Sequence, residues 1–408
     1  MSRRDWTRLV LAAIVVLIMV LASGGMGFAA GWYLKPQPTP SPTPPSTELE
    51  QRFRIVWEAW DILQRDFHRQ GPLDEQKMVR GAVDGMVRSL GDPYTVFVEP
   101  VQAKIFDQDL EGSFEGIGAT VDLVDGYLVI VEPLPDSPAL KAGLRPGDVV
   151  LEVDGKPLKD VELMQAIALI RGPKGTPVRL LIQRKGEAQP FEVSVVRQKI
   201  DLPTVSFRML DKGIAYVRLT EFNSQATARL ENALKGLMAQ NPTGLVLDLR
   251  GNPGGYLHIA VQVASEFIRE GPIVTESDRN GKVTEHNAQG QGLALDVPLV
   301  VLVDAGSASA SEIVAGAIQD TGRGTLIGRQ TLGKGSAQVA HTLSDGSSLR
   351  VTVTRWYTPK GHQLDGKGLT PDIVVPLDPS QPADKDAVLE RAIQFLTTPA
   401  DRPQARGT

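Results

Sequence analysis

The 408-residue sequence contains no cysteine. Disulfide bonds, thiolate metal sites and a cysteine nucleophile are therefore excluded. The sequence also lacks a basic block, because 43 Lys and Arg stand against 48 Asp and Glu, for a formal net charge of -5. Binding to the phosphate backbone of a nucleic acid needs clustered Lys and Arg, so nucleic acid is not expected as a partner. The content of 42% hydrophobic and 22% charged residues is typical of a globular protein, here of about two or three domains.

One long uncharged run stands near the N-terminus. The 26 residues from Leu9 to Leu34 carry no charge, and about 20 apolar residues suffice to cross a bilayer as a helix. Three arginines precede this run, so the positive-inside rule predicts that residues 1–8 are cytoplasmic and that the chain beyond residues 9–34 is outside. The alternative is a cleaved signal peptide, with small residues at 27–30 for the cut, which would leave the protein secreted or periplasmic.

The next two segments are a linker and a helical region. Residues 35–47 include "PQPTPSPTPPS", which predicts a semi-rigid polyproline II spacer. Apolar residues then recur at helical spacing and predict a helix over 48–68 whose stripe we expect to pack in a core. A second helix is predicted over 74–90, and residues 48–112 form a helical N-terminal region. The residues of the stripe are Phe53, Trp57, Trp60, Leu63 and Phe67.

Residues 113–198 change to short strands with two helices, the pattern of a small strand-rich domain. The glycines of "FEGIGATV", taken alone, are typical of a hairpin turn. Followed by "SPALKAGLRPGDVVLEVDGKPL", however, this stretch resembles the carboxylate-binding loop of a PDZ domain. The resemblance implies that Phe114, Gly116, Ile117 and Gly118 bind a peptide C-terminus, with backbone N–H groups facing the carboxylate while the peptide adds to a sheet edge.

Residues 199–397 alternate aliphatic runs with helical patterns, and 398–408 form a polar tail. The runs "GIAYVRL", "GLVLDLR", "PLVVLVD" and "GTLIGR" are separated by helical patterns at 225–240, 256–268 and 309–320. This alternation predicts an α/β layer with sites at the C-terminal ends of its strands. Two such ends carry unusual loops, "DLRGNPGGYL" and "DAGSASASEI".

Ser309 in the second loop has two interpretations. With Glu312 it forms the S-x-x-E of a capping box. A strand-to-helix junction also suits a nucleophile, because the helix N-terminus offers free N–H groups to an oxyanion. Only the presence of a partner base distinguishes a nucleophilic serine from a capping serine. Lys334, between two glycines in "TLGKGSAQ", is a candidate; its stretch also approaches a P-loop, but Gly335 replaces the required Ser or Thr, so nucleotide binding is not expected.

Several motifs in one order carry a family resemblance. "SASASEIVAGAIQD" followed by "GKGSAQ", together with "SLGDPYTVFV", "RGPKGTPV" and "DLRGNPGGYL", resembles the carboxyl-terminal processing, or tail-specific, proteases over roughly residues 50–397. The resemblance implies a serine–lysine dyad of Ser309 and Lys334. Gln338 matches a residue that positions the lysine, Asp320 matches an acidic position, and Arg171 matches an arginine that links the PDZ position to the active site.

The dyad sets physical conditions. A lysine serves as general base only if burial lowers its pKa from about 10.4 to roughly 7–8. An oxyanion hole would come from the Ala310 N–H and the N–H of Gly254 or Gly255. The charge of Asp320 near a helix C-terminus is explained without catalysis if it pairs with Arg323.

The predicted fold is therefore multidomain α/β: a protease core with an inserted PDZ-like domain, a helical N-terminal region and one transmembrane helix. We expect a membrane-anchored, extracytoplasmic serine endopeptidase that recognises substrate C-termini and processes or degrades exported proteins. Its expected partners are protein substrates with free C-termini and the membrane, with no metal and no cofactor, and the oligomeric state stays open. The alternative is a catalytically silent PDZ adaptor tethered to the membrane.

Overall fold

The computed structural model describes residues 47–69, 71–376 and 385–398. The predicted transmembrane helix over 9–34 lies outside these residues, as do nearly all of the linker and of the C-terminal tail. Among the described residues, no helix has the length and hydropathy to cross a bilayer. The chain divides into two compact units, residues 1–75 and residues 76–408.

The first unit contains the helix α2 (Thr47–Asp66), close to the range that the apolar spacing predicts. The prediction that its apolar stripe packs in a core is wrong, because no residue of α2 is buried. Trp57, for example, is 64% exposed. Helical periodicity shows that apolar side chains share a face, but burial needs a second element. The described residues of this unit supply no further complete helix or strand that could cover the stripe.

The second unit begins with α3 (Glu75–Arg88), β1 (Val96–Val98) and α4 (Pro100–Leu110). Strand β1 comes from the "GDPYTVFV" stretch and pairs antiparallel with β18 (Ser348–Tyr357), with Val96 opposite Arg350. The start of this unit is therefore tied to a strand near its end. Local sequence patterns do not indicate such a long-range pairing.

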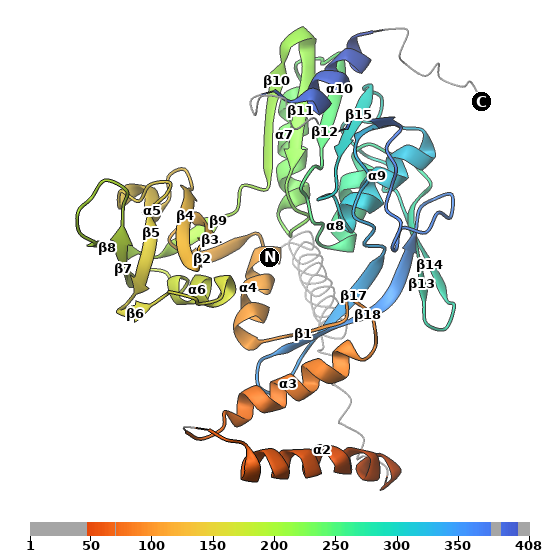
Figure 1. The fold of residues 1–408 in the computed structure, drawn as a ribbon. Helices are drawn as coiled ribbons and strands as arrows, with labels where there is room; N and C mark the ends of the chain where they lie inside the picture. The colour runs from red at the N-terminus through yellow and green to blue at the C-terminus, as the bar shows by residue number, and fades with distance from the viewer. Residues whose placement is uncertain (1–46, 70, 377–384, 399–408) are drawn as a thin grey trace, which may run out of the picture. The chain divides into compact units, whose positions relative to one another are not determined.

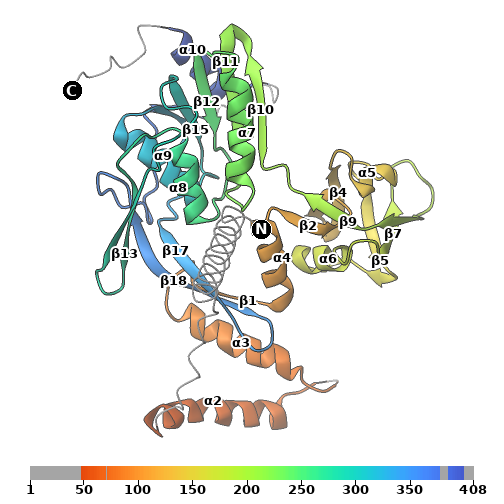
Figure 2. The same cartoon turned by 180° about the vertical axis from the view of Figure 1, so that it is seen from behind.

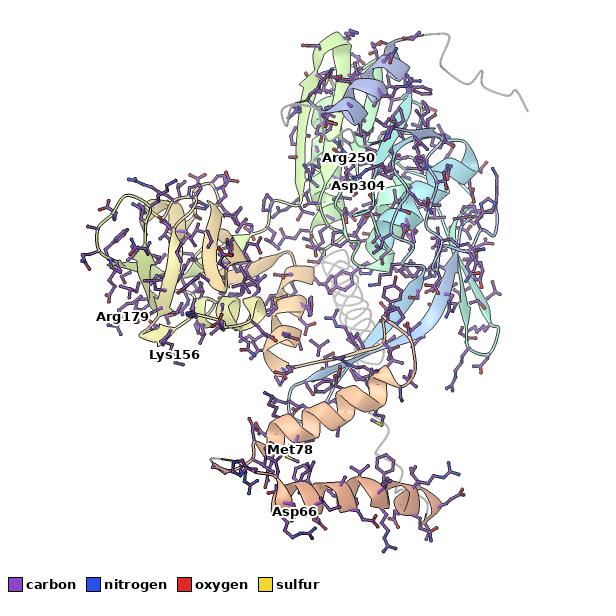
Figure 3. All side chains as sticks on the ribbon, in the orientation of Figure 1. Asp66, Met78, Lys156, Arg179, Arg250 and Asp304 are labelled. Atoms are coloured by element: carbon purple, nitrogen blue, oxygen red, sulfur yellow. The ribbon has the colours of Figure 1, made fainter. Side chains whose placement is uncertain are left out.

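The PDZ-like domain follows in the chain (Figure 1). Its buried apolar side chains form a core of their own. Its main sheet has the order β3-β4-β5-β7-β8, with β6 paired to β5, and a separate ribbon joins β2 to β9 where the chain enters and leaves. The elements are β2 (Ser113–Gly116), β3 (Ala119–Val124), β4 (Tyr127–Pro133), α5 (Pro138–Lys141), β5 (Val149–Val153), β6 (Lys156–Pro157), α6 (Leu163–Ile170), β7 (Pro177–Gln183), β8 (Phe191–Val196) and β9 (Gln198–Asp201). Lys156 and Arg179, labelled in Figure 3, lie on β6 and β7 of this domain.

The α/β core is a sheet in the order β10-β11-β12-β15-β16-β19. All neighbours run parallel except β10, which pairs antiparallel with β11. Alternate side chains of the strands pack against α7, α8 and α9 on one face and against α10 on the other, as expected for a buried parallel sheet. The elements are β10 (Val205–Leu210), η1 (Asp211–Gly213), β11 (Ile214–Leu219), α7 (Ala226–Met238), β12 (Gly244–Asp248), α8 (Leu257–Ser265), β15 (Leu299–Val303), α9 (Ala310–Thr321), β16 (Thr325–Gly328), β19 (Ile373–Val374) and α10 (Ala387–Thr397).

A second sheet of the same unit has the order β1-β18-β13-β14, with β17 paired to β18 (Figure 2). Its remaining strands are β13 (Pro272–Asp278), β14 (Val283–Asn287) and β17 (Ser336–Thr342). The sequence patterns did not indicate this sheet. It matters for function because β17 begins two residues after Lys334 and holds the lysine loop in place.

The predicted pairing of Asp320 with Arg323 is wrong. The chain turns at Gly322, which has the left-handed φ of 70° that ends α9. This turn directs the Arg323 guanidinium to carbonyl oxygens beyond the helix. They belong to Phe267, Ala294 and Val297, at 2.9, 2.6 and 2.7 Å.

Candidate active site

Two loops meet beyond the C-terminal ends of the neighbouring parallel strands β12 and β15. We call residues 250–256 the glycine loop and residues 304–309 the serine loop. The Gly251 N–H donates to Asp304 Oδ1 at 2.9 Å, and the Ala308 N–H donates to the Asn252 carbonyl at 3.0 Å. A Cβ atom on Gly306 would lie 2.8 Å from the Gly251 Cα, so the close approach requires glycine.

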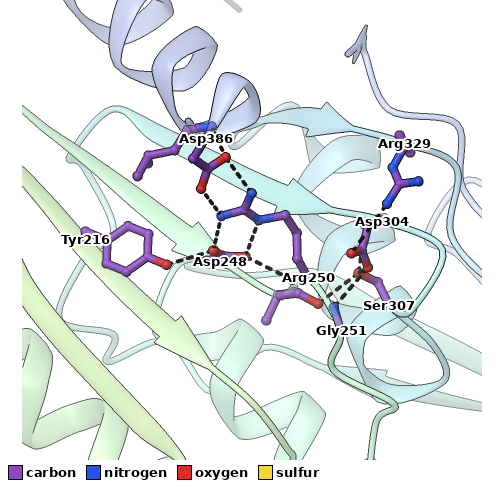
Figure 4. A network of polar contacts seen from close by, with 10 residues as sticks. Tyr216, Asp248, Arg250, Gly251, Asp304, Ser307, Arg329 and Asp386 are labelled. Atoms are coloured by element: carbon purple, nitrogen blue, oxygen red, sulfur yellow. Dashed lines mark hydrogen bonds and ion pairs between the residues drawn. The ribbon is translucent and has the colours of Figure 1, made fainter. Parts of the chain in front are cut away.

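An ion network around the buried Asp248 anchors the glycine loop (Figure 4). The Arg250 guanidinium donates to both oxygens of Asp248, at 2.9 and 2.6 Å, and to both oxygens of Asp386, at 2.8 Å each. Asp248 is fully buried and also accepts from the Tyr216 hydroxyl at 2.7 Å. Burial, followed by the charge of Asp248, raises the pKa of Tyr216 to about 12. Because Asp386 caps α10, the network joins the start of this loop to the C-terminal helix. Arg250 and Asp304 are labelled together in Figure 3.

Ser309 occupies a strained turn at the start of α9. Its backbone has φ 57° and ψ -116°, and the residue is 5% exposed. A positive φ costs a non-glycine residue of order 1–3 kcal/mol, and such residues cluster at functional sites. A Cβ atom on Gly254 would lie 2.7 Å from the Ser309 Cβ. The glycine loop therefore lies directly against Ser309, in the strand–turn–helix setting that displays a nucleophilic serine.

The capping box predicted from S-x-x-E is present. Its second half is a 2.9 Å hydrogen bond from the Ser309 N–H to Glu312 Oε2. This bond holds the backbone of the serine and does not use its hydroxyl. The two interpretations of Ser309, cap and nucleophile, are therefore compatible.

Glu312 also binds the loop that carries Lys334. Its carboxylate, which is fully buried, also accepts from the Thr331 hydroxyl, from the Gly333 N–H at 2.7 Å and from the Lys334 N–H at 2.9 Å. One carboxylate therefore joins the backbone of the serine to the backbone of the lysine loop. Reasoning from the sequence gave Glu312 only the capping role, and the S-x-x-E pattern carries no further signal.

Lys334 is half-buried beside an aromatic ring. Its Nζ lies 5.4 Å from the centroid of the Tyr94 ring, a residue of the "GDPYTVFV" stretch. Burial is the main cause that lowers the pKa of Lys334; Arg350 lowers it further and Glu312 opposes the shift. The glycine-flanked loop lies close to another part of the chain, because a Cβ atom on Gly335 would lie 2.1 Å from the Asp365 nitrogen.

Gln338 lies near the start of β17, at a bulge in the pairing with β18. Its Nε2 donates to Ser336 Oγ at 3.0 Å and to Thr352 Oγ1 at 3.2 Å. These contacts fix the amide within the second sheet, and in the described part of the chain none of them joins it to Lys334.

Asp320 lies at the opposite end of α9 from Ser309, about 16 Å along a helix axis that rises about 1.5 Å per residue. Its Oδ2 accepts from the Lys360 N–H at 2.9 Å, and its Oδ1 lies 3.3 Å from His362 Nδ1. The carboxylate holds the turn after β18. The structure therefore does not bring it to the serine.

The three candidate oxyanion donors differ in their partners. The Gly254 N–H donates to the Asn252 side chain at 2.9 Å. Ala310 is the first residue of α9, so its N–H has no acceptor within the helix. Gly255 has φ 145°, and a Cβ atom there would lie 2.3 Å from the Phe222 carbonyl oxygen. Gly255 and Ala310 are thus the donors that the local hydrogen bonds leave for a ligand.

The predicted carboxylate loop borders a cavity of about 490 Å³. Phe114, Ile117 and Gly118 line it. Gly116 does not, and a Cβ atom there would lie 3.0 Å from the Phe114 ring. The loop carbonyls of Ile117 and Gly118 accept backbone hydrogen bonds from the segment before and within α5, at 2.8 and 2.9 Å. Strand β2 pairs with β9 and not with β3, so the hairpin-turn interpretation of these glycines is wrong.

Arg171 follows α6 and reaches outside the PDZ-like domain. It donates to Asp109 Oδ1 at 2.9 Å and to Gln108 Oε1 at 3.2 Å, both on α4. Its guanidinium carbon also lies 4.1 Å from the centroid of the Phe114 ring. Arg171 therefore joins the carboxylate loop to the helix that precedes the domain.

Glu312→Gln tests whether this carboxylate positions Ser309. The amide keeps one acceptor oxygen and turns an NH₂ donor toward N–H donors, and each lost charged hydrogen bond is worth about 1.5–3 kcal/mol. We expect the melting temperature to fall and the labelling rate of Ser309 by a fluorophosphonate probe to drop at least about tenfold. Glu285→Gln, at an exposed position on β14, is the control. A Glu312→Gln protein with wild-type labelling would contradict the assignment.

Comparison with known proteins gives the family. The model of peptidase family S41 matches residues 213–375, a PDZ domain model matches 129–184, and a model of the activating protease CtpB N-terminal domain matches 19–100. The carboxy-terminal-processing protease of Bartonella bacilliformis is 40% identical and aligns with 74% of this chain and 70% of its own. Carboxy-terminal processing protease CtpA of Bacillus subtilis is 37% identical over 79% of this chain and 69% of its own.

The solved structure of a photosystem II D1 C-terminal processing protease is also similar. It shares 32% sequence identity, covers 88% of this chain and 99% of its own, and gives a TM-score of 0.50. The strained serine turn, the glycine loop and the PDZ domain thus occur in a chain whose relatives are peptidases. The chain belongs to peptidase family S41, the carboxy-terminal processing proteases, and is a serine-type endopeptidase with a PDZ domain.

Proposed function

We propose that the protein cleaves peptide bonds with a serine–lysine dyad. Neutral Lys334 removes the proton of the Ser309 hydroxyl as its oxygen attacks the peptide carbonyl. The lysine then gives this proton to the leaving amine as the C–N bond breaks, and water hydrolyses the acyl-enzyme by the same route. The observation that carries the proposal is the Glu312 carboxylate, which binds the backbone N–H groups of both residues at 2.9 Å.

The N–H groups of Ala310 and Gly255 are proposed as the oxyanion hole. The Gly254 N–H already donates to the Asn252 side chain, which leaves the Gly255 N–H as the donor of the glycine loop. Ala310 offers its N–H because it stands at the N-terminus of α9. Gln338 supports the lysine indirectly, because its contacts with Ser336 and Thr352 hold the first residues of β17. Asp320 then has a structural role, since it binds the Lys360 N–H.

The PDZ domain is proposed to bind the C-terminus of the substrate in the cavity beside the carboxylate loop. Backbone N–H groups of this loop face the terminal carboxylate and the tail adds along β3. Arg171 is proposed to transmit the binding of a tail from the PDZ domain to the glycine loop. Its partner Asp109 is followed in α4 by Leu110, which leads toward that loop. The Leu110 carbonyl accepts from the Ser224 N–H at 3.1 Å, and the Phe222 N–H donates to the Gly254 carbonyl at 2.8 Å.

We also propose that the enzyme is a single-pass membrane protein with its catalytic part outside the cytoplasm, acting on exported proteins. This proposal rests on the uncharged run of residues 9–34 and on the three arginines before it. The alternative, a cleaved signal peptide and a secreted or periplasmic enzyme, leaves the catalytic proposal unchanged.

Ser309→Ala should abolish cleavage of unfolded casein, since loss of a nucleophile costs up to about 10⁶ in rate. The fold should survive, because Glu312 holds the backbone N–H of residue 309. Ser307→Ala and Ser311→Ala are matched controls: each loses a buried hydrogen bond to a carbonyl, at 2.8 and 2.9 Å, and should lower the melting temperature while keeping activity. The assignment fails if either control loses activity while Ser309→Ala retains it, and a wild type that cuts nothing would favour the adaptor.

The pH dependence tests Lys334 as a neutral base. Because burial lowers the pKa of Lys334, the neutral form is populated at lower pH than for an ordinary lysine, and kcat/KM should rise with pH through this ionisation. Lys334→Arg should be nearly inactive, since a guanidinium does not release its proton. His341→Ala, at an exposed position of β17, should be active. Loss of activity in His341→Ala with retention in Lys334→Arg would replace the dyad with a histidine mechanism.

Amidation of the substrate tests tail recognition. A peptide with a C-terminal amide should show a higher KM than the same peptide with a free carboxylate, because the loop N–H groups would face a neutral group in place of an anion. The difference should shrink when the salt concentration is raised if the contact is solvent-accessible. Equal KM values for the two peptides would remove the PDZ domain from substrate selection.

A further inference from the structure

The protease core forms part of the wall of the cavity beside the carboxylate loop. Its wall includes residues that follow the PDZ domain and residues that follow β11, in addition to β3 and α6. Most of these side chains are apolar, as in other peptide and ligand sites. Three are charged, namely Asp109, Arg171 and Glu221.

The three charges do not balance. Asp109 and Arg171 form an ion pair at 2.9 Å. Glu221 accepts only a long hydrogen bond from Asn223 Nδ2, at 3.4 Å, and in the described part of the chain no cationic side chain forms an ion pair with it. The wall therefore carries one uncompensated negative charge whenever Glu221 is ionised.

Burial makes this uncompensated charge unfavourable. It raises the pKa of Glu221 to about 7, with Asp109 adding to the shift and Asn223 opposing it. When folding raises the pKa of a carboxylate, the fold loses stability as the pH rises from the ordinary pKa of about 4.3 through the raised pKa. The fold gains nothing from an ionised Glu221, whereas a cation brought in by a ligand would compensate the charge.

A tail that binds here brings its own carboxylate to the neighbouring loop. A tail of apolar residues alone would add a second negative charge to a wall that already has one in excess. A tail with one lysine or arginine is neutral overall, and its cation gains from a partly desolvated partner. Because successive side chains of an added strand point to opposite faces, the cation must stand at a position whose side chain faces Glu221.

We propose that Glu221 is a specificity-determining residue that selects substrate tails carrying a lysine or arginine close to their C-terminal carboxylate. This proposal rests on the proposed use of the cavity for tail recognition. It names the substrate class for that site: proteins that end in an apolar segment interrupted by a basic residue.

The test compares two fluorogenic peptides that differ only at the third residue from the end, lysine in one and methionine in the other. At pH 8, above the pKa of Glu221, the full chain should cut the lysine peptide with at least about tenfold higher kcat/KM, mainly through KM. Glu221→Gln should reduce this ratio to near one. Glu285→Gln, which removes an exposed carboxylate from β14, should keep the ratio.

Binding to the Ser309→Ala protein separates this proposal from the catalytic one. Fluorescence anisotropy of the same peptides should show the lysine preference without any cleavage, and Glu221→Gln should lose it. Glu221→Lys should reverse the preference, so that a glutamate tail binds more tightly than a lysine tail. Equal binding of the lysine and methionine peptides to the unsubstituted Glu221 protein, or a lysine preference that survives Glu221→Gln, would overturn the proposal. Equal binding of free and amidated tails would instead overturn the use of the cavity.

Discussion

The Glu312 carboxylate is the contact on which the catalytic geometry depends. Ser309 and Lys334 come from different loops, one before α9 and one before β17, and neither loop is regular enough to fix a side chain by itself. Glu312 binds the backbone N–H of both and also the N–H of Gly333. Because the carboxylate is buried, a misplaced loop would leave it with unpaired oxygens, and the free energy cost of that state keeps both loops in place.

Close backbone approach is the second constraint. Gly254 lies against Ser309 and Gly335 against Asp365, at distances that leave no room for a Cβ atom. These glycines explain why the sequence motifs around the site are rich in glycine. The Arg250 network adds rigidity, because it ties the glycine loop to the buried end of β12 and to the N-terminus of α10. Loops held in this way can keep Ser309 in a strained conformation.

Sequence reasoning found what local patterns encode. The aliphatic runs predicted β11, β12, β15 and β16, and S-x-x-E predicted the capping box. It missed the second sheet, because β1 and β18 are far apart in the chain and their pairing leaves no periodic signal. Tyr94 was missed beside Lys334 for the same reason. Periodicity reports that the apolar side chains of α2 share a face and not what covers them. Proximity in sequence does not predict the partners of Arg323, because Gly322 turns the chain away from Asp320.

The charged groups of this enzyme differ in the partners that the fold gives them. Arg250 has two carboxylate partners and Arg171 has Asp109, so the fold compensates both of these charges. Burial of Lys334 lowers its pKa and burial of Glu221 raises its pKa, and in both cases the fold disfavours the charged form. Within residues 47–69, 71–376 and 385–398, neither side chain forms an ion pair, which suits the proposed roles of Lys334 as a base and of Glu221 as a binding site for a cation. Burial also lowers the pKa of Arg323 and raises that of Glu266, but Arg323 donates to three carbonyl oxygens and Glu266 accepts from the Leu293 N–H at 2.9 Å. Burial therefore points to a role on substrate only where such hydrogen-bond partners are few, as at Lys334 and Glu221.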